Sequence, residues 1–313
     1  MSDLALAVDI GGTKMAVGLV DQAGCVRHRQ QVPTPAAELE VGTGPGEERA
    51  ARAGRAARAE QAEPMWRDLV DLIERVRAKA GDDRIVVCGV GCGGPMGPGG
   101  EEVSPLNIPG WRSFPLRSRL AALSGRPTFV DNDAKALALG EGWIGGAAGR
   151  RDFIGMVVST GVGGGIVTDG RLLSGRLGNA GHIGHMVVVP DGRPCACGSH
   201  GCLEAEASGT ALAAITGHPA QLAPAEMVER TGMLVGRAIA SVVNLLDLPL
   251  AVVSGSVALG FGAPFFAAAQ REVDLRCRLE FARGAQVVPG DLGDRGPLIG
   301  AARLGWLGLD GRV

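Results

Sequence analysis

Residues 4–20 read LALAVDIGGTKMAVGLV, and this stretch decides the fold. The apolar run 4–10 predicts a buried strand, the sequence GGTK at 11–14 predicts a tight turn, and the apolar run 15–20 predicts a second strand. The same order of strand, glycine turn and strand returns at 153–168, which reads FIGMVVSTGVGGGIVT. One such unit near the start of each half of the chain predicts two α/β lobes.

Length and composition agree with two lobes and exclude several classes of partner. A chain of 313 residues is long enough to bury two cores, and 46% apolar with 20% charged residues is typical of a soluble globular protein. A net charge of −2 gives no electrostatic reason to expect nucleic acid or an anionic membrane as partner. No apolar run is long enough to span a bilayer, and the first strand begins with too little charge for a signal peptide. We therefore expect a cytoplasmic protein.

Three of the seven cysteines lie close together as Cys195, Cys197 and Cys202, in a C-x-C-x4-C pattern. Thiolates this close on a glycine-turned loop suit one Zn²⁺ ion, with His185 as the natural fourth ligand and His200 as the alternative. An odd number of clustered cysteines argues against a disulfide framework. Four protein ligands leave no open position for a reacting water, so the predicted zinc is structural.

The expected domains follow from these patterns. Residues 1–130 form the N-terminal lobe, which a closing helix at 295–313 completes. Residues 131–294 form the C-terminal lobe, with the zinc loop at 182–204. The segment 33–64 is rich in Ala, Arg, Gly and Glu and has almost no large apolar residue, so we expect a variable insertion there, mobile or a loose surface helix, without chemistry.

The glycine turns are candidate phosphate sites, because a turn of small residues leaves backbone N–H groups free to bind phosphate oxygens. The first hairpin adds the carboxylate of Asp9, where a Mg²⁺–phosphate group would lie. Neither turn is a Walker A loop or a Rossmann fingerprint, and a single copy would be an ordinary β-turn. Two copies favour nucleotide-dependent phosphoryl transfer. The expected nucleotide contacts are Asp9, Gly11, Gly12, Thr13 and Lys14 in the first hairpin and Thr160, Gly161, Gly163 and Gly164 in the second.

Phosphoryl transfer to a hydroxyl also needs a group that accepts the hydroxyl proton, and Asp133 is the candidate. It follows the expected strand 127–130 and begins a helix, whose N-terminal dipole favours an ionised carboxylate. Asn132 beside it can orient the acceptor by hydrogen bonding. Helix capping by Asn132 or Asp133 is the alternative interpretation.

Taken together, these residues resemble the ROK family of sugar kinases. The resemblance extends from the first strand to the closing helix, interrupted only by the Ala/Arg-rich insertion. Its motifs are DIGGTK at 9–14, NIPGW at 107–111, VDNDA at 130–134, STGVGGGI at 159–166, GHIGH at 181–185 and CACGSHGCLE at 195–204. The zinc motif is the specific one, whereas DIGGTK alone indicates only the wider hexokinase–actin-like fold. The implied architecture is a two-lobed, ribonuclease H-like α/β fold with an interdomain cleft.

The resemblance implies ATP-dependent phosphorylation of a hexose, usually at its 6-hydroxyl, with Mg²⁺ accompanying ATP and a structural Zn²⁺. Asp133 would be the base, and the two glycine hairpins together with Ser254 and Gly255 would hold ATP. The sugar hydroxyls would be bound by Asn107, Asn132, Asp133, His185 and Glu204. The family also suggests a homodimer or homotetramer.

Two positions depart from the glucokinase-like pattern. His182 stands where such kinases usually carry Glu, and an imidazole can donate a hydrogen bond to the carbonyl of an N-acyl group. This form is similar to bacterial N-acetylmannosamine kinases, whereas residues 107–111 look like the glucokinase version. We expect glucose to be slightly favoured, with N-acetylmannosamine or another N-acyl hexosamine as the alternative. His182 as a spare zinc ligand or a packed histidine also stays open, and Lys135, where the family commonly has Asn, is expected to be a solvated surface residue.

Two other functions compete with a kinase. DNA-binding regulators of the same family carry an additional N-terminal helix-turn-helix domain, whereas here Asp9 is reached within the first strand, so we expect no nucleic-acid partner. A non-catalytic sugar sensor would keep the fold without transferring phosphate. Asp9, Lys14 and Asp133 argue against a sensor, although His182 keeps that interpretation open.

Overall fold

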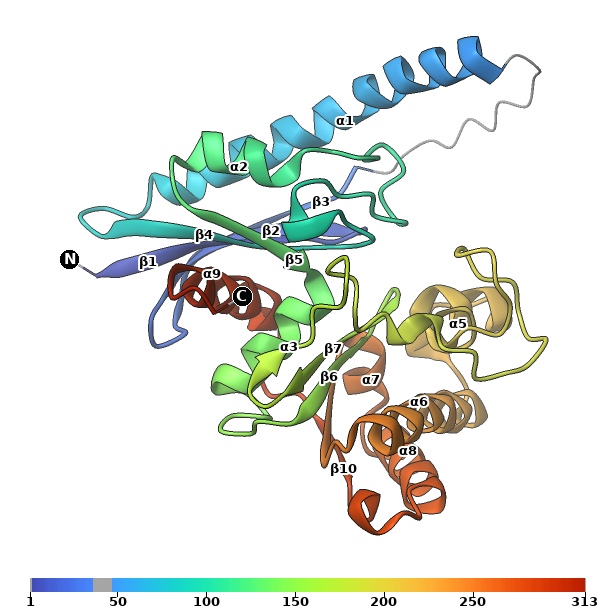
Figure 1. Ribbon diagram of the computed structural model, residues 1–313. Coiled ribbons are helices and arrows are strands. Elements are labelled where there is room, and N and C mark those ends of the chain that lie inside the picture. Colours follow the sequence, from blue (N-terminus) through green and yellow to red (C-terminus); the bar gives the residue numbers. More distant parts are fainter. Residues whose placement is uncertain (1, 36–46, 313) are drawn as a thin grey trace. The chain divides into compact units, whose positions relative to one another are not determined.

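The computed structural model describes residues 2–35 and 47–312, and the chain divides into two compact units, each built around a five-stranded sheet (Figure 1). Unit 1 comprises Met1–Asp133, Gly175–Asn179 and Pro297–Val313. Unit 2 comprises Ala134–Ser174 and Ala180–Gly296. The prediction of two α/β lobes is confirmed.

The sheet of unit 1 has the strand order β3-β2-β1-β4-β5. The first three strands form an antiparallel meander, because the tight turn at 11–13 joins β1 directly to β2. The last two run parallel to β1, because helical connections return the chain to the same edge. The bounds are β1 Asp3–Ile10, β2 Lys14–Asp21, β3 Val26–Pro33, β4 Arg84–Cys92 and β5 Thr128–Asn132.

The sheet of unit 2 repeats this order as β8-β7-β6-β9-β10. Three antiparallel strands are again followed by two parallel ones, so the internal repeat that the glycine hairpins predict extends over a whole sheet. The bounds are β6 Phe153–Val158, β7 Val162–Thr168, β8 Arg171–Leu172, β9 Leu250–Ser254 and β10 Gln286–Pro289.

Helices cover both faces of each sheet. In unit 1, α1 and α2 lie on one face and α9 on the other (Figure 1). Their bounds are α1 Glu47–Arg77, α2 Leu116–Ser124 and α9 Gly296–Leu309. Unit 2 contains α3 Asp133–Ile144, α4 Leu203–Ala207, α5 Gly209–Thr216, α6 Ala225–Leu246, α7 Ser256–Phe261 and α8 Ala263–Arg276. Among the described residues, no helix combines the length and apolar character that a membrane crossing requires.

The two faces of β1 explain where Asp9 points. Its even-numbered residues, including Leu6 and Val8, belong to the apolar core under α1, and side chains alternate along a strand. Its odd-numbered residues therefore face α9. Ala5 and Ala7 on this face are small, and Asp9 follows them. This face accepts α9 closely because Gly89 of β4 lies against the backbone of Ala301.

In unit 2, α3 lies unusually close to the sheet. A Cβ atom on Gly165 of β7 would come within 2.7 Å of the Cα atom of Lys135, and one on Gly155 of β6 would come equally close to Ala138. These glycines let the helix backbone approach the strands. The expectation that Lys135 is a solvated surface residue is wrong, since Lys135 lies in this contact and is only 1% exposed.

Two boundaries differ from the sequence analysis. The glycine run 160–164 is not all turn: β7 begins at Val162, so Gly163 and Gly164 lie in a strand paired with β6. Glycine has no side chain that would resist this pairing. In the expected insertion 33–64, residues 36–46 lie outside the described residues, and α1 begins at Glu47, inside the segment expected to be an insertion. Ala, Arg and Glu favour helix, which explains the early start.

Candidate functional site

The candidate site in unit 1 begins with carboxylates at the carboxyl ends of parallel strands. Asp9 of β1 pairs with Gly91 of β4, which pairs in turn with Asp131 of β5. Asp133 follows two residues later, as the first residue of α3. Gly91 lies between these two aspartates and carries no side chain, and the carboxyl ends of parallel strands are the usual place for ligands in α/β proteins.

Asp9 is an electrostatically strained group. The residue is only 7% exposed. Burial, and then the negative charge of Asp133, raises the pKa of the Asp9 carboxyl from 3.8 to about 7, against the opposing effect of Lys14 and Arg29. Lys14 and Arg29 only partly offset burial and the repulsion from Asp133, and a Mg²⁺ ion carried by a nucleotide would add the positive charge that favours the ionised carboxylate.

Asn107 is brought to the first glycine hairpin from a distant part of the chain. A Cβ atom on Gly12 would lie only 2.5 Å from its Nδ2 atom, and one on Gly93 would lie 3.2 Å from its Oδ1 atom. Asn107 therefore fits between two backbone segments that have no side chains, and it is itself exposed. Asn132 is buried beside Asp133, and its backbone N–H donates to the carboxylate of Asp131 at 2.7 Å.

Hydrogen bonds and a buried aromatic ring fix the loop that carries Asn107. Arg112 donates hydrogen bonds to the carbonyl oxygens of Pro105, Ile108 and Trp111 at 2.7–2.9 Å. The Trp111 ring is fully buried and stacks on Phe114 at 4.3 Å between centroids. Trp111 therefore packs beneath the loop and supports it.

The second glycine hairpin lies in unit 2, and residues 159–161 form its turn. The carbonyl oxygens of Ser159 and Thr160 accept hydrogen bonds from the backbone N–H groups of Gly209 and Thr210 at the start of α5. The Ser159 hydroxyl lies 2.9 Å from that of Ser256. The structure therefore brings this turn next to the segment 254–256, as both nucleotide predictions require. Gly209 and Thr210 were missed, because nothing in their local pattern points to the turn.

Two glycines of this hairpin have packing reasons of their own. A Cβ atom on Gly163 would lie 2.7 Å from that of Ala134, and one on Gly164 would lie 3.0 Å from Ile183. These contacts explain glycine at both positions without a ligand. Their predicted role at the nucleotide stays a prediction, as does that of Gly255.

The run GHIGH lies along β7. Cβ atoms on Gly181 and Gly184 would collide with the backbone of Gly164 and Val162, so only glycine allows this approach. The loop thereby places His182 and His185 with their ring centroids 6.0 Å apart. Both rings are half-buried.

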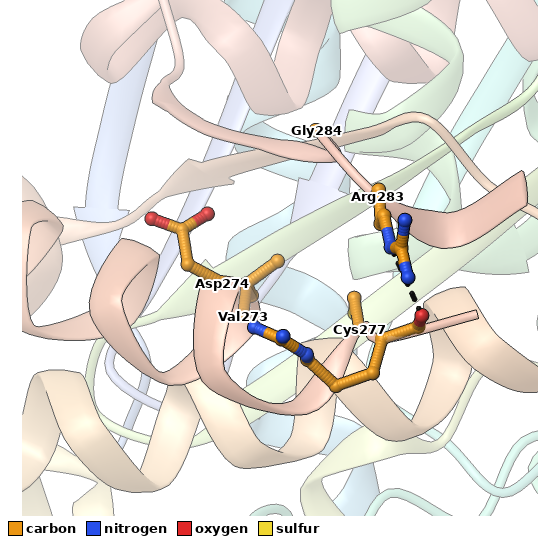
Figure 2. A pocket seen from close by; sticks show the side chains of 6 residues that line it. Val273, Asp274, Cys277, Arg283 and Gly284 are labelled. Carbon is orange, nitrogen blue, oxygen red and sulfur yellow. Dashed lines mark hydrogen bonds between the residues drawn. The ribbon is translucent and has the colours of Figure 1, made fainter. Parts of the chain in front are cut away.

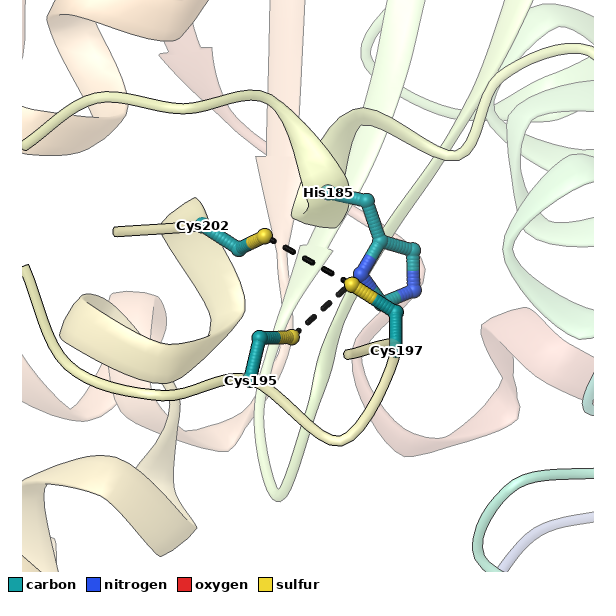
Figure 3. A group of neighbouring side chains, drawn as sticks. All are labelled: His185, Cys195, Cys197 and Cys202. Carbon is teal, nitrogen blue, oxygen red and sulfur yellow. Dashed lines mark hydrogen bonds between the residues drawn. The ribbon is translucent and has the colours of Figure 1, made fainter. Parts of the chain in front are cut away.

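The predicted zinc ligands converge (Figure 3). The ligand atoms of His185, Cys195, Cys197 and Cys202 all lie within 4.8 Å of one another, with Cys195 Sγ 3.6 Å from His185 Nδ1 and Cys197 Sγ 3.7 Å from Cys202 Sγ. Tetrahedral zinc with Zn–S bonds of about 2.3 Å places its ligands about 3.8 Å apart, so this set fits zinc. His200 is exposed and is not a member of this cluster.

Two surface cavities lie elsewhere. One of about 390 Å³ is at the C-terminal end of α8 (Figure 2), and its lining residues are Val273, Asp274, Cys277, Arg278, Arg283 and Gly284. Another of about 420 Å³ lies in unit 1 and includes Arg77 and Arg126. Neither is lined by a residue expected at the nucleotide, the sugar or the metal.

With the geometry established, comparison with known proteins defines the class. The model of the ROK family matches residues 46–306, which is more than half of the chain. The chain therefore belongs to the ROK family. It is a sugar kinase of that family, an ATP-dependent phosphotransferase.

Relatives within the family differ in their sugars. An N-acetylmannosamine kinase from Citrobacter koseri is 36% identical over 272 residues, which cover 82% of this chain and 84% of that protein. The structure of a ROK hexokinase from Thermus thermophilus is similar with a TM-score of 0.75 and 32% identity, over 98% of this chain and 99% of that one. A ROK family glucokinase from Streptomyces griseus, solved with glucose and AMPPNP, gives a TM-score of 0.77 and 29% identity, over 97% and 99%.

Proposed function

We propose that this kinase transfers the γ-phosphoryl group of ATP to the 6-hydroxyl of a hexose, with N-acetylmannosamine as the preferred sugar. The observation that carries the chemistry is the carboxylate pair of unit 1. Asp9 is buried and its carboxyl has a pKa of about 7, partly because of Asp133, so this position favours a bound divalent cation. Phosphoryl transfer needs such a cation and a base beside it.

In this proposal each residue of the pair has one task. Asp9 would hold the Mg²⁺ that accompanies ATP. Asp133 accepts the proton of the 6-hydroxyl as that oxygen bonds to the γ-phosphorus, while the bond from phosphorus to the bridging oxygen breaks and ADP leaves. Lys14 and the backbone of the two glycine turns bind the phosphate oxygens. Asn107, held between Gly12 and Gly93, fixes the sugar through its exposed amide.

The metal site supports sugar binding and takes no part in the reaction. His185, Cys195, Cys197 and Cys202 would hold Zn²⁺, which stabilises the loop and supplies no open coordination position. With Nδ1 of His185 turned to Cys195, its Nε2 atom is the nitrogen left for a sugar hydroxyl. Glu204 follows the last ligand and would bind a second hydroxyl.

Two observations favour an N-acyl sugar over the glucose that the sequence analysis slightly favours. His182 replaces the glutamate that would accept a bond from a sugar hydroxyl, and an imidazole N–H can donate to an acyl carbonyl. N-acetylmannosamine kinases also reach 36% identity with this chain. Glucose is the second candidate, because residues 107–111 follow the glucokinase pattern and a glucokinase structure matches over 97% of the chain.

Initial rates on glucose, mannose, N-acetylglucosamine and N-acetylmannosamine, measured side by side by ADP release, test this proposal. We expect the highest kcat/KM for N-acetylmannosamine. His182→Glu should move the preference towards glucose by roughly tenfold to a hundredfold, the range for one gained or lost polar contact, while His218→Gln at an exposed histidine should change nothing. A highest kcat/KM for glucose in the wild type would contradict the N-acyl preference, and an unaltered profile in His182→Glu would show that His182 lies outside the pocket.

The expected assembly is a homodimer or homotetramer, as the family resemblance suggests. Light scattering during size-exclusion chromatography measures it directly. A monomer at micromolar concentration would contradict this expectation.

A further inference from the structure

Glu204 makes a contact that its expected role at the sugar does not explain. Its Oε2 atom accepts a hydrogen bond from the backbone N–H of Val162 at 2.9 Å. The same oxygen covers Gly161, where a Cβ atom would come within 2.7 Å of it. One side of the carboxylate therefore holds the second glycine turn.

The Val162 N–H can donate to Glu204 because the β6–β7 pairing does not use it. Ser159 N donates to Gly161 O at 2.9 Å, and Val158 pairs with Val162 in the next position. Hydrogen-bonded and non-hydrogen-bonded pairs alternate along an antiparallel ladder, so the Val158–Val162 pair is of the second kind. Its N–H groups point away from the partner strand, and the one on Val162 meets Glu204.

The position of Glu204 is set by the metal loop. It lies in α4, which begins directly after the metal ligand Cys202, and Leu203 N donates to Met186 O at 2.8 Å. Two residues further on, the buried Glu206 forms an ion pair with Arg230 of α6 at 2.6 Å.

Glu206 also accepts a hydrogen bond from the backbone N–H of Arg193 at 2.7 Å. Because Arg193 belongs to the loop that carries Cys195, the metal loop and α4 are tied together at both ends. We therefore expect a displacement of this loop to move α4 and with it the Glu204 carboxylate.

We infer that Glu204 is a positioning residue for the nucleotide: its carboxylate holds the turn 159–161, so the metal loop controls nucleotide affinity as well as sugar binding. This inference rests on the proposed function, in which that turn contacts the phosphates of ATP. Without the bond from Val162, the turn would gain freedom that nucleotide binding must remove.

Binding of the ATP analogue AMPPNP with Mg²⁺, measured by calorimetry without sugar, tests the inference. Glu204→Ala should weaken binding roughly tenfold, the value of one hydrogen bond to a charged acceptor. Glu204→Gln keeps an acceptor oxygen and should stay within about threefold of the wild type. Glu229→Gln, at an exposed carboxylate of α6, is the matched control and should bind like the wild type.

Val162→Pro removes the donor and leaves Glu204 in place, since proline is tolerated as the first residue of a strand. We expect the same loss of AMPPNP affinity as in Glu204→Ala, with sugar affinity retained. Circular dichroism and melting temperature confirm that each variant is folded. If the wild type binds AMPPNP and neither Glu204→Ala nor Val162→Pro weakens it, the inference is overturned. If the folded wild type binds no AMPPNP, the proposed function itself fails.

Zinc depletion provides an independent test of the inference. Removing the metal with a chelator should weaken AMPPNP binding by the wild type, and should weaken it much less in Glu204→Ala, where the connection is already broken. An equal loss in both proteins would show that the metal loop acts on the nucleotide by another route.

Discussion

Replacing Asp9 by Asn should stabilise the protein at pH 8 while abolishing turnover. Burial and the charge of Asp133 raise the pKa of the Asp9 carboxyl from 3.8 to about 7. Between pH 4 and pH 7 the folded protein therefore keeps a proton that the unfolded chain has released. The unfolded state binds fewer protons in this window, so the free energy of unfolding falls as the pH rises through it, and the loss is complete above pH 7.

The magnitude follows from the shift. About three pKa units at about 1.4 kcal/mol each correspond to roughly 4 kcal/mol, which is an upper bound for the destabilisation that the ionised Asp9 causes at pH 8. Asparagine carries no charge at any pH, so the variant lacks this destabilisation. For a lobe of this size the difference corresponds to roughly 10 °C in melting temperature.

Melting curves of the wild type and Asp9→Asn, recorded without Mg²⁺ from pH 4.5 to pH 8, measure the effect. The relevant measure is how the difference in melting temperature between the two proteins changes with pH. A packing effect of the introduced amide would be the same at every pH. Asp82→Asn at an exposed carboxyl shows what the substitution itself does. A difference that stays constant across this range would refute the reasoning. Mg²⁺ added at pH 8 should raise the melting temperature of the wild type and not that of Asp9→Asn, because the cation offsets the buried charge.

Three further outcomes are expected. Asp133→Asn should lower kcat by a factor of about 10²–10⁴ while calorimetry still detects sugar binding, because the variant loses only the proton acceptor; unchanged turnover would remove Asp133 as the base. Cys197→Ser, or zinc chelation, should lower sugar affinity and turnover together with bound zinc, which elemental analysis measures, whereas metal-free protein with full activity would contradict a structural metal. Trp111→Ala should destabilise unit 1 by about 3–5 kcal/mol through loss of its buried stack on Phe114; a loss below about 1 kcal/mol, measured by urea denaturation, would show that the loop adapts to the missing ring.

The metal loop and the glycine hairpins could be predicted because their signals are local. Cysteine spacing restricts Cys195, Cys197 and Cys202 to one loop, and alternating apolar runs around a glycine turn specify a hairpin wherever they occur. The repeat of the hairpin was sufficient to predict two lobes. Asp133 could also be proposed from its place between a strand and a helix.

Other features depend on which faces of distant elements meet. A lysine is usually solvated, yet Lys135 is buried because Gly165 allows α3 to approach β7. The raised pKa of Asp9 comes from burial and from Asp133, which is far away in the sequence. No local pattern reports either effect.

The sequence by itself determined the strands, the turns and the kinds of side chain available for a metal, a phosphate and a proton. Only the tertiary structure decided that Glu204 bonds to Val162, 42 residues away, and that Asn107 fits against Gly12. The physical reason is that a local pattern sets the conformation of a segment. The partner of a buried polar group is set by the packing of whole sheets and helices, where glycine allows backbones to approach.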